Sequence, residues 1–296
     1  MSSDLVQSLS GVTQLLWHEP EASLASGILF GTQGHFPAGL SDALRVTGTL
    51  HIVAVSGQNM SILGGFVGKL SHIFGWRISL LIQSLAILGY IFLVGGGASV
   101  IRSGAMALIA LFAQATGRQA DSGRALAATA AGMVLVHPDF LSDTGWQLSV
   151  LATAGIIWVE PILSRAIAKL PEIVSGSLAV TLSAQLLTWP VIAANFHQFS
   201  LISIPANVLV EWSVPWIMGL SMLSVLVHQL LASIGEVISW LAWVPLAYFI
   251  AVIYWLAKVP WASVGLIGFS TGMGIMYYTV IAGVIWRWQL VKTRLS

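Results

Sequence analysis

The sequence contains no cysteine and few charged residues, and both absences narrow the classes of protein it can belong to. Of its 296 residues, 8% are charged and 57% are hydrophobic, whereas soluble domains carry about 25% charged residues. A chain so poor in charge cannot cover a water-facing surface, which indicates an integral membrane protein. Without cysteine it forms no disulfide and offers neither a thiolate nucleophile nor a thiolate metal ligand.

The sequence also has no motif for nucleotide binding, no histidine spacing for metal binding and no secretion signal. The stretch GGFVGKL at 64–70 differs from a phosphate-binding loop, because Leu63 and Leu70 stand where that loop requires glycine and a hydroxyl residue. The seven histidines occur singly, with none of the spacings that gather a metal ion. We therefore expect no cofactor and no metal. The N-terminus has no basic segment leading into an apolar run, so no cleavable signal peptide is expected.

What the sequence does contain is a series of apolar runs. They predict an all-α polytopic membrane protein with about nine, or seven to nine, transmembrane helices, some of them interrupted. Residues 1–48 are predicted to form an amphipathic segment at the membrane surface, and residues 49–296 a transmembrane channel domain. The apolar runs are 50–68, 79–95, 99–116, 124–137, 146–160, 176–196, 201–227, 237–257 and 262–286.

The basic residues predict the orientation of these helices, because short cytoplasmic loops are enriched in lysine and arginine. Nine of the twelve basic residues fall in alternate connections between the runs, and the pattern places the N-terminus outside and the C-terminus in the cytoplasm. These nine are Lys69, Arg77, Arg118, Arg124, Arg165, Lys169, Arg287, Lys292 and Arg294.

One apolar run has an unexpectedly polar middle, TLHIVAVSGQNMSIL at 49–63, which holds Ser56, Gly57, Gln58 and Asn59. Unpaired polar groups in a bilayer cost several kcal/mol each. A glycine flanked by serine and glutamine favours a break in the helix, and irregular backbone at membrane depth occurs only where it is buried in protein or lines a cavity. We interpret this stretch as a polar constriction in a pathway.

Further polar residues lie in other predicted spans, and Pro205 and Pro215 favour a second helix break. Each amide can line a pathway or simply join helices, and an arginine near a span end can extend toward the interface. Two ionisable residues could pair with each other, but their predicted offset of roughly 10 Å along the membrane normal is unfavourable for a direct ion pair. The residues are Arg102, Gln147, Gln185, Asn207 and Glu211.

Two other functions stay open on these observations. An intramembrane serine hydrolase would use Ser56 with a histidine, but His51 is five residues away and points about 140° from it on a helix. His137 and His197 fall in predicted outer loops. A secondary transporter for a small molecule or lipid would need a closed substrate pocket. We expect a channel rather than an enzyme.

Three blocks of the sequence resemble the competence domain of ComEC-type DNA-uptake proteins, in matching order across residues 25 to about 225. The first is LRVTGTLHIVAVSGQNMSIL. The second is GASVIRSGAMALIALFAQATGRQAD, followed by DTGWQLSVLATAGIIWVEP, and the third is LSAQLLTWPVIAANFHQFSLISIPANVLVEWSVPW. Where this chain has Gln58 and Asn59, members of that family commonly have Leu-His.

The resemblance implies a multi-pass protein of the bacterial cytoplasmic membrane that passes single-stranded DNA into the cell during natural transformation. With DNA as the cargo, we favour a contact with passing phosphates for Arg102 over an ion pair with Glu211. It implies partners as well: a cytosolic helicase-like motor, and outer DNA-receptor and nuclease proteins. Longer members also carry an oligonucleotide-binding-like domain and a metallo-β-lactamase-like domain. Neither is expected in this sequence, which lacks the His-x-His-x-Asp-His cluster of the latter.

Overall fold

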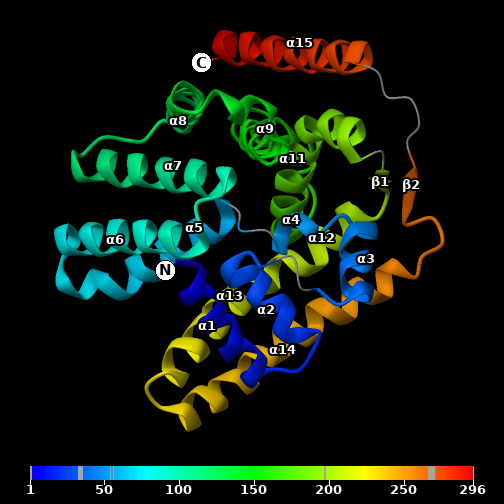
Figure 1. The fold of residues 1–296 in the computed structure, drawn as a ribbon. Coiled ribbons are helices and arrows are strands. Elements are labelled where there is room, and N and C mark those ends of the chain that lie inside the picture. Colours follow the sequence, from blue (N-terminus) through cyan, green and yellow to red (C-terminus); the bar gives the residue numbers. More distant parts are fainter. Residues whose placement is uncertain are drawn as a thin grey trace.

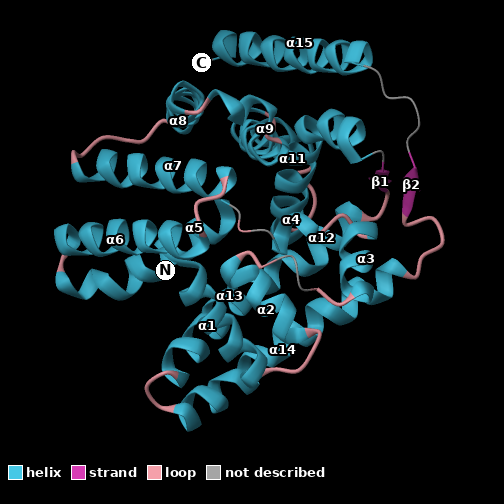
Figure 2. Cartoon of the chain, in the orientation of Figure 1, coloured by secondary structure: helices cyan, strands magenta, loops and turns pink. Residues whose placement is uncertain are grey.

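The computed structural model describes residues 2–32, 36–53, 55, 57–196, 198–265 and 271–295, most of which are helical (Figure 2). The first half of the chain contains α1 (Ser2–Leu16), α2 (Glu21–Phe30), α3 (Ala38–Val46), α4 (Leu50–Val53), α5 (Gly57–Ser71), α6 (Trp76–Val94), α7 (Ala98–Ala115) and α8 (Ser122–Val136). The second half contains α9 (Thr144–Trp158), α10 (Glu160–Ala166), α11 (Glu172–Phe196), β1 (Gln198–Ser200), α12 (Ser203–Val210), α13 (Val214–His228), α14 (Ala232–Ala257), β2 (Ser263–Gly265) and α15 (Thr271–Leu295).

Fewer helices than predicted are long and apolar enough to cross a membrane. Within the described residues there are five such segments: α6, α7, α11, the continuous stretch from α12 to α13, and α14. The pair α9 and α10 adds a sixth if it counts as one span with a bend of 49°. The helical class and the apolar spans are therefore confirmed, whereas the count of nine is not.

The missing spans have local causes. The run predicted at 50–68 is divided, because α4 ends at Val53, Val55 is not helical and α5 begins at Gly57. Helix α8 has 15 residues, fewer than the roughly 20 of a straight crossing. The run predicted at 262–286 begins as strand β2 and continues as α15, whose last turns are basic.

Helix α2 lies inside the protein rather than at its periphery. All nine residues from Ala22 to Phe30 are buried, and the helix packs against α1, α13 and α14 (Figure 1). Residues of α2, α3, α13 and α14 belong to the largest apolar core. The sequence analysis placed residues 1–48 at the membrane surface. Their position relative to a membrane stays a prediction, but within the protein α2 is a core helix.

Local sequence explains where several helices begin. Helix α8 starts after Asp121, whose carboxylate accepts a hydrogen bond from the Arg124 backbone N–H at 2.9 Å. Helix α9 starts after Asp143, which accepts from the Trp146 N–H at 2.6 Å. Carboxylates suit this position because they satisfy the free N–H groups of the first turn and its positive dipole.

Helix α15 lies at the opposite end of the view from α13 and α14 (Figure 1). It is joined to α14 through β2, which pairs antiparallel with β1 in the register Phe199↔Val264. Two tyrosine hydroxyls attach it to α11: Tyr277 donates to the Leu186 carbonyl at 2.9 Å and Tyr278 to the Leu187 carbonyl at 2.8 Å. Pro190 has no N–H with which to bond the Leu186 carbonyl four residues earlier, so Tyr277 supplies the missing donor.

Candidate functional site: two polar centres between helices

The first polar centre lies where α4 gives way to α5. Gly57 is the first residue of α5, and Gln58 beside it is half-buried. Ser56, which we predicted as part of the constriction, lies outside the described residues. The described residues nearby agree with the predicted break, because α4 ends at Val53, Val55 is not helical and α5 begins at Gly57.

Arg102 of α7 approaches Gly57 closely. A side chain at position 57 would begin 3.3 Å from Nη2 of Arg102 and 3.5 Å from Cβ of Ser103. Glycine is thus the residue that allows the guanidinium to lie against the start of α5. Arg102 is only 4% exposed, so the charge is inside the protein and not extended toward a surface.

The contacts of Arg102 are to neutral groups. Its Nε donates to Ser149 Oγ at 2.8 Å, and its Nη1 contacts Met106 Sδ at 3.1 Å. Ser149 Oγ lies 3.0 Å from Ser99 Oγ, which joins α9 to the first turn of α7. In the described part of the chain no acidic side chain forms an ion pair with Arg102. The hydroxyls Ser99 and Ser149 were missed from the sequence, because serine is common in apolar helices.

Asn59 faces away from this centre and into the core. It is fully buried, and its Nδ2 donates to the Ile28 carbonyl at 2.9 Å. Tyr90 of α6 donates to the next carbonyl, that of Leu29, also at 2.9 Å. Both carbonyls belong to the last turn of α2, where the helix provides no N–H partner. Asn59 and Tyr90 thus cap the end of the buried helix, and Asn59 Oδ1 has no hydrogen-bond partner.

The second polar centre surrounds the 3-10 turn between α12 and α13. The helical stretch from Ser203 to His228 is continuous through this turn, so the second helix break predicted from Pro205 and Pro215 is not present. Glu211 lies in a short 3-10 turn there, and its Oε2 accepts from Ser177 Oγ of α11 at 2.6 Å. Gln185, also on α11, donates through Nε2 to Ser203 Oγ at 2.7 Å. Asn207 is buried on α12, and its Oδ1 has no partner. The structure thus brings Gln185, Asn207 and Glu211 to the contact of α11 with α12 and the turn that follows it.

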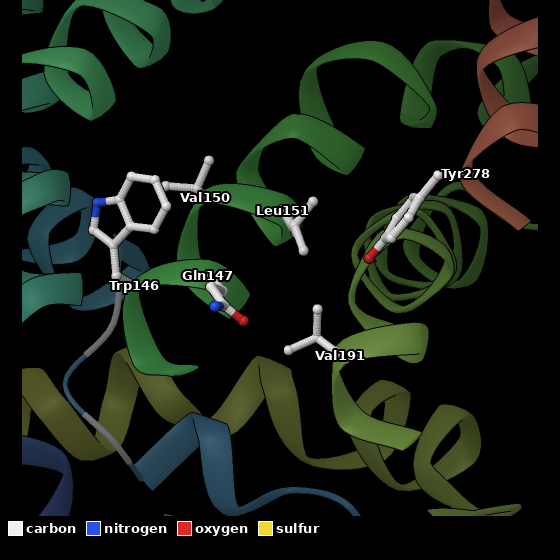
Figure 3. A pocket seen from close by; sticks show the side chains of 6 residues that line it. All are labelled: Trp146, Gln147, Val150, Leu151, Val191 and Tyr278. Atoms are coloured by element: carbon white, nitrogen blue, oxygen red, sulfur yellow. The ribbon is translucent and has the colours of Figure 1, made fainter. Parts of the chain in front are cut away.

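Gln147 belongs to neither centre. Its Nε2 donates to the Leu141 carbonyl at 2.7 Å. The side chain lines an open pocket of about 290 Å³ between α9, α11 and α15 (Figure 3), together with Trp146, Val150, Leu151, Val191 and Tyr278. These neighbours are apolar except for the Tyr278 hydroxyl, which is already bonded to Leu187, and the indole N–H of Trp146, which is buried. This pocket presents little polar surface to a ligand.

The two ionisable side chains do not pair with each other. Arg102 contacts α9 and α5, whereas Glu211 contacts α11, so the ion pair considered from the sequence is absent from the described contacts. The two centres are connected through the packing of α9 against α11, where Gly155 fits against the Ser183 backbone. Among the residues described, no group of three histidine, aspartate or glutamate side chains could hold a metal ion.

Comparison with known proteins agrees with the three blocks noted in the sequence. The family description "Competence protein" matches residues 28–291. The "ComE operon protein 3" of Bacillus subtilis (strain 168) is 29% identical over 203 residues, which cover 67% of this chain and 26% of that protein. The chain therefore spans about a quarter of the length of this relative. No solved structure matches it. Because the family description extends from α2 to α15, the chain belongs to the competence protein family.

Proposed function

We propose that this chain forms part of the route by which DNA crosses the cytoplasmic membrane during natural transformation, and that the DNA passes as a single strand. The family match supports a role in competence, and the apolar helices support a membrane location. In this proposal the chain acts as a channel for DNA and not as an enzyme.

The observation that carries the proposal is that each of the two polar centres contains one ionisable side chain. Arg102 lies beside the break before α5, and Glu211 lies in the 3-10 turn between α12 and α13. Neither forms an ion pair with a residue that the structure describes. Ionisable groups in membrane segments are costly, and they usually face a pathway when no partner neutralises them.

The low content of charged residues in the chain is compatible with the passage of DNA, a polyanion that must not be bound too tightly. Each phosphate neutralised by lysine or arginine adds affinity through counterion release, so many such contacts would retain DNA instead of passing it. Neutral groups such as Gln58, Gln185 and Asn207 can exchange hydrogen bonds with a strand at lower cost. We assign these groups to the lining of the DNA path. We also assign Gln147 to this lining, although it lies outside the two polar centres.

The remaining features of the proposal concern orientation, energy and partners. From the alternation of basic connections we propose that the N-terminus is outside and the C-terminus in the cytoplasm. The sequence has no ATP-binding loop, so we assign the driving force to a separate cytosolic helicase-like motor. Outer DNA-receptor and nuclease proteins would deliver the strand. A reporter fused after Ser296 should be cytoplasmic, and a periplasmic or extracellular reporter would contradict this orientation.

Uptake of labelled DNA tests the function. In cells that lack the gene, DNA protected from added nuclease should be lost, whereas DNA bound to the cell surface should remain. Complementation with Gly57→Leu should fail at normal protein abundance, because the new side chain would displace Arg102 from the start of α5. Gly64→Leu, on the same helix but with no heavy atom within 4 Å of the new Cβ, is the matched control and should restore uptake.

Other outcomes would redirect the proposal. Unchanged amounts of protected DNA in the deletion strain would reject a role in DNA passage. If import of a small solute or lipid is lost instead, the chain is a secondary transporter. Equal uptake with the Gly57 and Gly64 variants would mean that the break before α5 is only a packing feature.

A further inference from the structure

We infer that Arg102 and the first turn of α5 together form a binding site for a single phosphodiester group. The inference rests on the proposed function for the identity of its ligand, a nucleic acid backbone. Three features of the molecule support the site: the unused N–H donors of Arg102, the N-terminal end of α5 that Arg102 faces, and the positive charge that the guanidinium and the helix end contribute.

Arg102 has more hydrogen-bond donors than the protein uses. A guanidinium carries five N–H bonds. In the structure one is directed at Ser149 Oγ and one at Met106 Sδ, and Nη2 donates to no described residue. The side chain is 96% buried, as its exposed fraction is 4%. A buried cation with free N–H bonds in an apolar bundle is costly unless an anionic ligand completes it.

The free donors face a helix end that also attracts anions. Nη2 is the atom nearest to the position where a Gly57 side chain would begin, at 3.3 Å. The first N–H groups of α5 have no carbonyl partner within the helix, and the helix dipole places about half a positive charge there. A cation beside a positive helix end is repelled by it. An anion that contacts Nη2 and the first N–H groups of α5 at the same time is attracted by both.

The serine pair gives the guanidinium a fixed position. Ser149 Oγ accepts from Arg102 Nε and is itself within 3.0 Å of Ser99 Oγ, so α9 and the first turn of α7 hold the charged group through its Nε. Such preorganisation lowers the cost of ordering the side chain when a ligand binds. Ser99 and Ser149 are therefore positioning residues rather than ligands of the phosphate.

The local charge is suited to one phosphate group. Arg102 contributes one positive charge and the helix end about half of one, and no described acidic side chain pairs with the arginine. A phosphodiester, with one negative charge, leaves about half a positive charge at the site, whereas a phosphate monoester, with about 1.5 to 2 negative charges, leaves between zero and about half a negative charge. Charge does not separate the two ligands, so the assignment to an internucleotide linkage rests on the proposed function.

Equilibrium dialysis of the purified protein in detergent tests the site. The probe is radiolabelled thymidylyl-thymidine, which has a single phosphodiester, and its uncharged methylphosphonate analogue and inorganic phosphate serve as comparisons. We expect the diester to bind at least about tenfold more tightly than the analogue, in line with the strength of charge-assisted hydrogen bonds. Binding of inorganic phosphate more tightly than of the diester would contradict the assignment to an internucleotide linkage.

Four variants assign that binding to the proposed atoms. Arg102→Gln should weaken diester binding by about tenfold or more, and Arg102→Lys by less, because a point charge replaces the planar fork. Gly57→Ala should also weaken binding while leaving thermal stability unchanged, since only the end of a flexible side chain must move. Arg77→Gln is the matched control: Arg77 is exposed and lies over the Trp76 ring, so binding should stay at the wild-type level.

A longer oligonucleotide supplies a second readout. The slope of log affinity against log salt should fall by about 0.7 when Arg102 is replaced by glutamine, because one single-strand phosphate contact is lost. Wild-type affinity in Arg102→Gln, or equal affinity for the diester and its methylphosphonate, would overturn the site. Lost diester binding with normal DNA uptake would support the site and contradict its place in the DNA path.

Discussion

Helices α2 and α6 are both apolar and each carries one charged residue near its start, yet they occupy opposite environments. From Ala22 to Phe30 every residue of α2 is buried. Helix α6 buries only Ser79, Leu80, Ile87 and Tyr90, and large side chains on its other face are exposed. In a membrane protein both the protein interior and the lipid surroundings are apolar. The hydropathy of a helix therefore cannot distinguish a helix enclosed by protein from one that faces lipid.

Side-chain size distinguishes the two helices better than hydropathy. The first seven residues of α2, EASLASG, are mostly small, whereas the outer face of α6 carries Leu81, Leu85, Leu88 and Phe92. Helices associate in membranes through close packing and interhelical hydrogen bonds, and small residues allow the backbones to approach. The comparison therefore separates closed helix faces, where added volume is costly, from open faces, where it is tolerated.

The largest expected effect follows from enlarging a glycine on the closed face of α2. A side chain at Gly27 would begin 2.5 Å from Val53 Cγ1 and 2.9 Å from Phe36 Cζ. Gly27→Leu should therefore destabilise the protein by about 3 kcal/mol or more and sharply lower its abundance in membranes. Gly89→Leu on α6, where no heavy atom lies within 4 Å, should leave abundance unchanged. Equal loss in both variants would reject the distinction between closed and open faces.

The contact between α9 and α11 gives the second prediction. A side chain at Gly155 would collide with the backbone carbonyl of Ser183, which cannot move aside as a side chain can. Gly155→Ala should cost about 1–3 kcal/mol of unfolding free energy, measured by denaturant titration in detergent. Gly132→Ala on α8 meets open space and should be neutral or slightly stabilising, because alanine favours helix over glycine. A neutral Gly155→Ala would show that the two helices can separate.

A smaller effect is expected at the polar cap of α2. Asn59→Leu and Tyr90→Phe each remove a donor to the last turn of that helix, and hydrogen bonds between membrane helices are worth about 0.6 kcal/mol on average and up to about 1.7. Asn59→Leu also removes the unpartnered Oδ1, so its loss should be the lesser of the two. Ser61→Ala, which removes a bond within α5 to Gly57, is the control and should change stability less than either.

These contacts show how far the sequence could predict the structure. The runs at 79–95 and 99–116 correspond closely to α6 and α7, because each is long, apolar and uninterrupted. The break before Gly57 was predicted from local chemistry, since glycine and polar neighbours act on the backbone where they stand. The role of Asn59 was not, because its partner Ile28 is 31 residues away and no local pattern specifies which helix supplies a carbonyl.

The same limit explains why the burial of α2 and the role of the two serines were missed. Helix α2 is short, and only its neighbours α13 and α14, nearly 200 residues later, make it a core helix. Ser149 matters because Arg102 reaches it across 47 residues. Local propensity predicts where a helix begins or breaks. The pairing of helices depends on packing between distant segments, which a single sequence does not specify.

The smallest effect is expected where α15 is attached to α11. Tyr277→Phe leaves the Leu186 carbonyl, already deprived of a helical partner by Pro190, without its donor. The loss should be about 0.6 kcal/mol, too small to lower abundance but sufficient to speed hydrogen exchange along α15, whose outer face is largely exposed. Tyr254→Phe is the control, because that hydroxyl donates to no described residue. The double change Pro190→Ala with Tyr277→Phe sharpens the test: an alanine N–H can bond the Leu186 carbonyl within α11, so the tyrosine should then be dispensable for that carbonyl. If Tyr277→Phe speeds exchange equally with and without Pro190, the hydroxyl does not replace the missing helical bond, and α15 is attached through its apolar contacts alone.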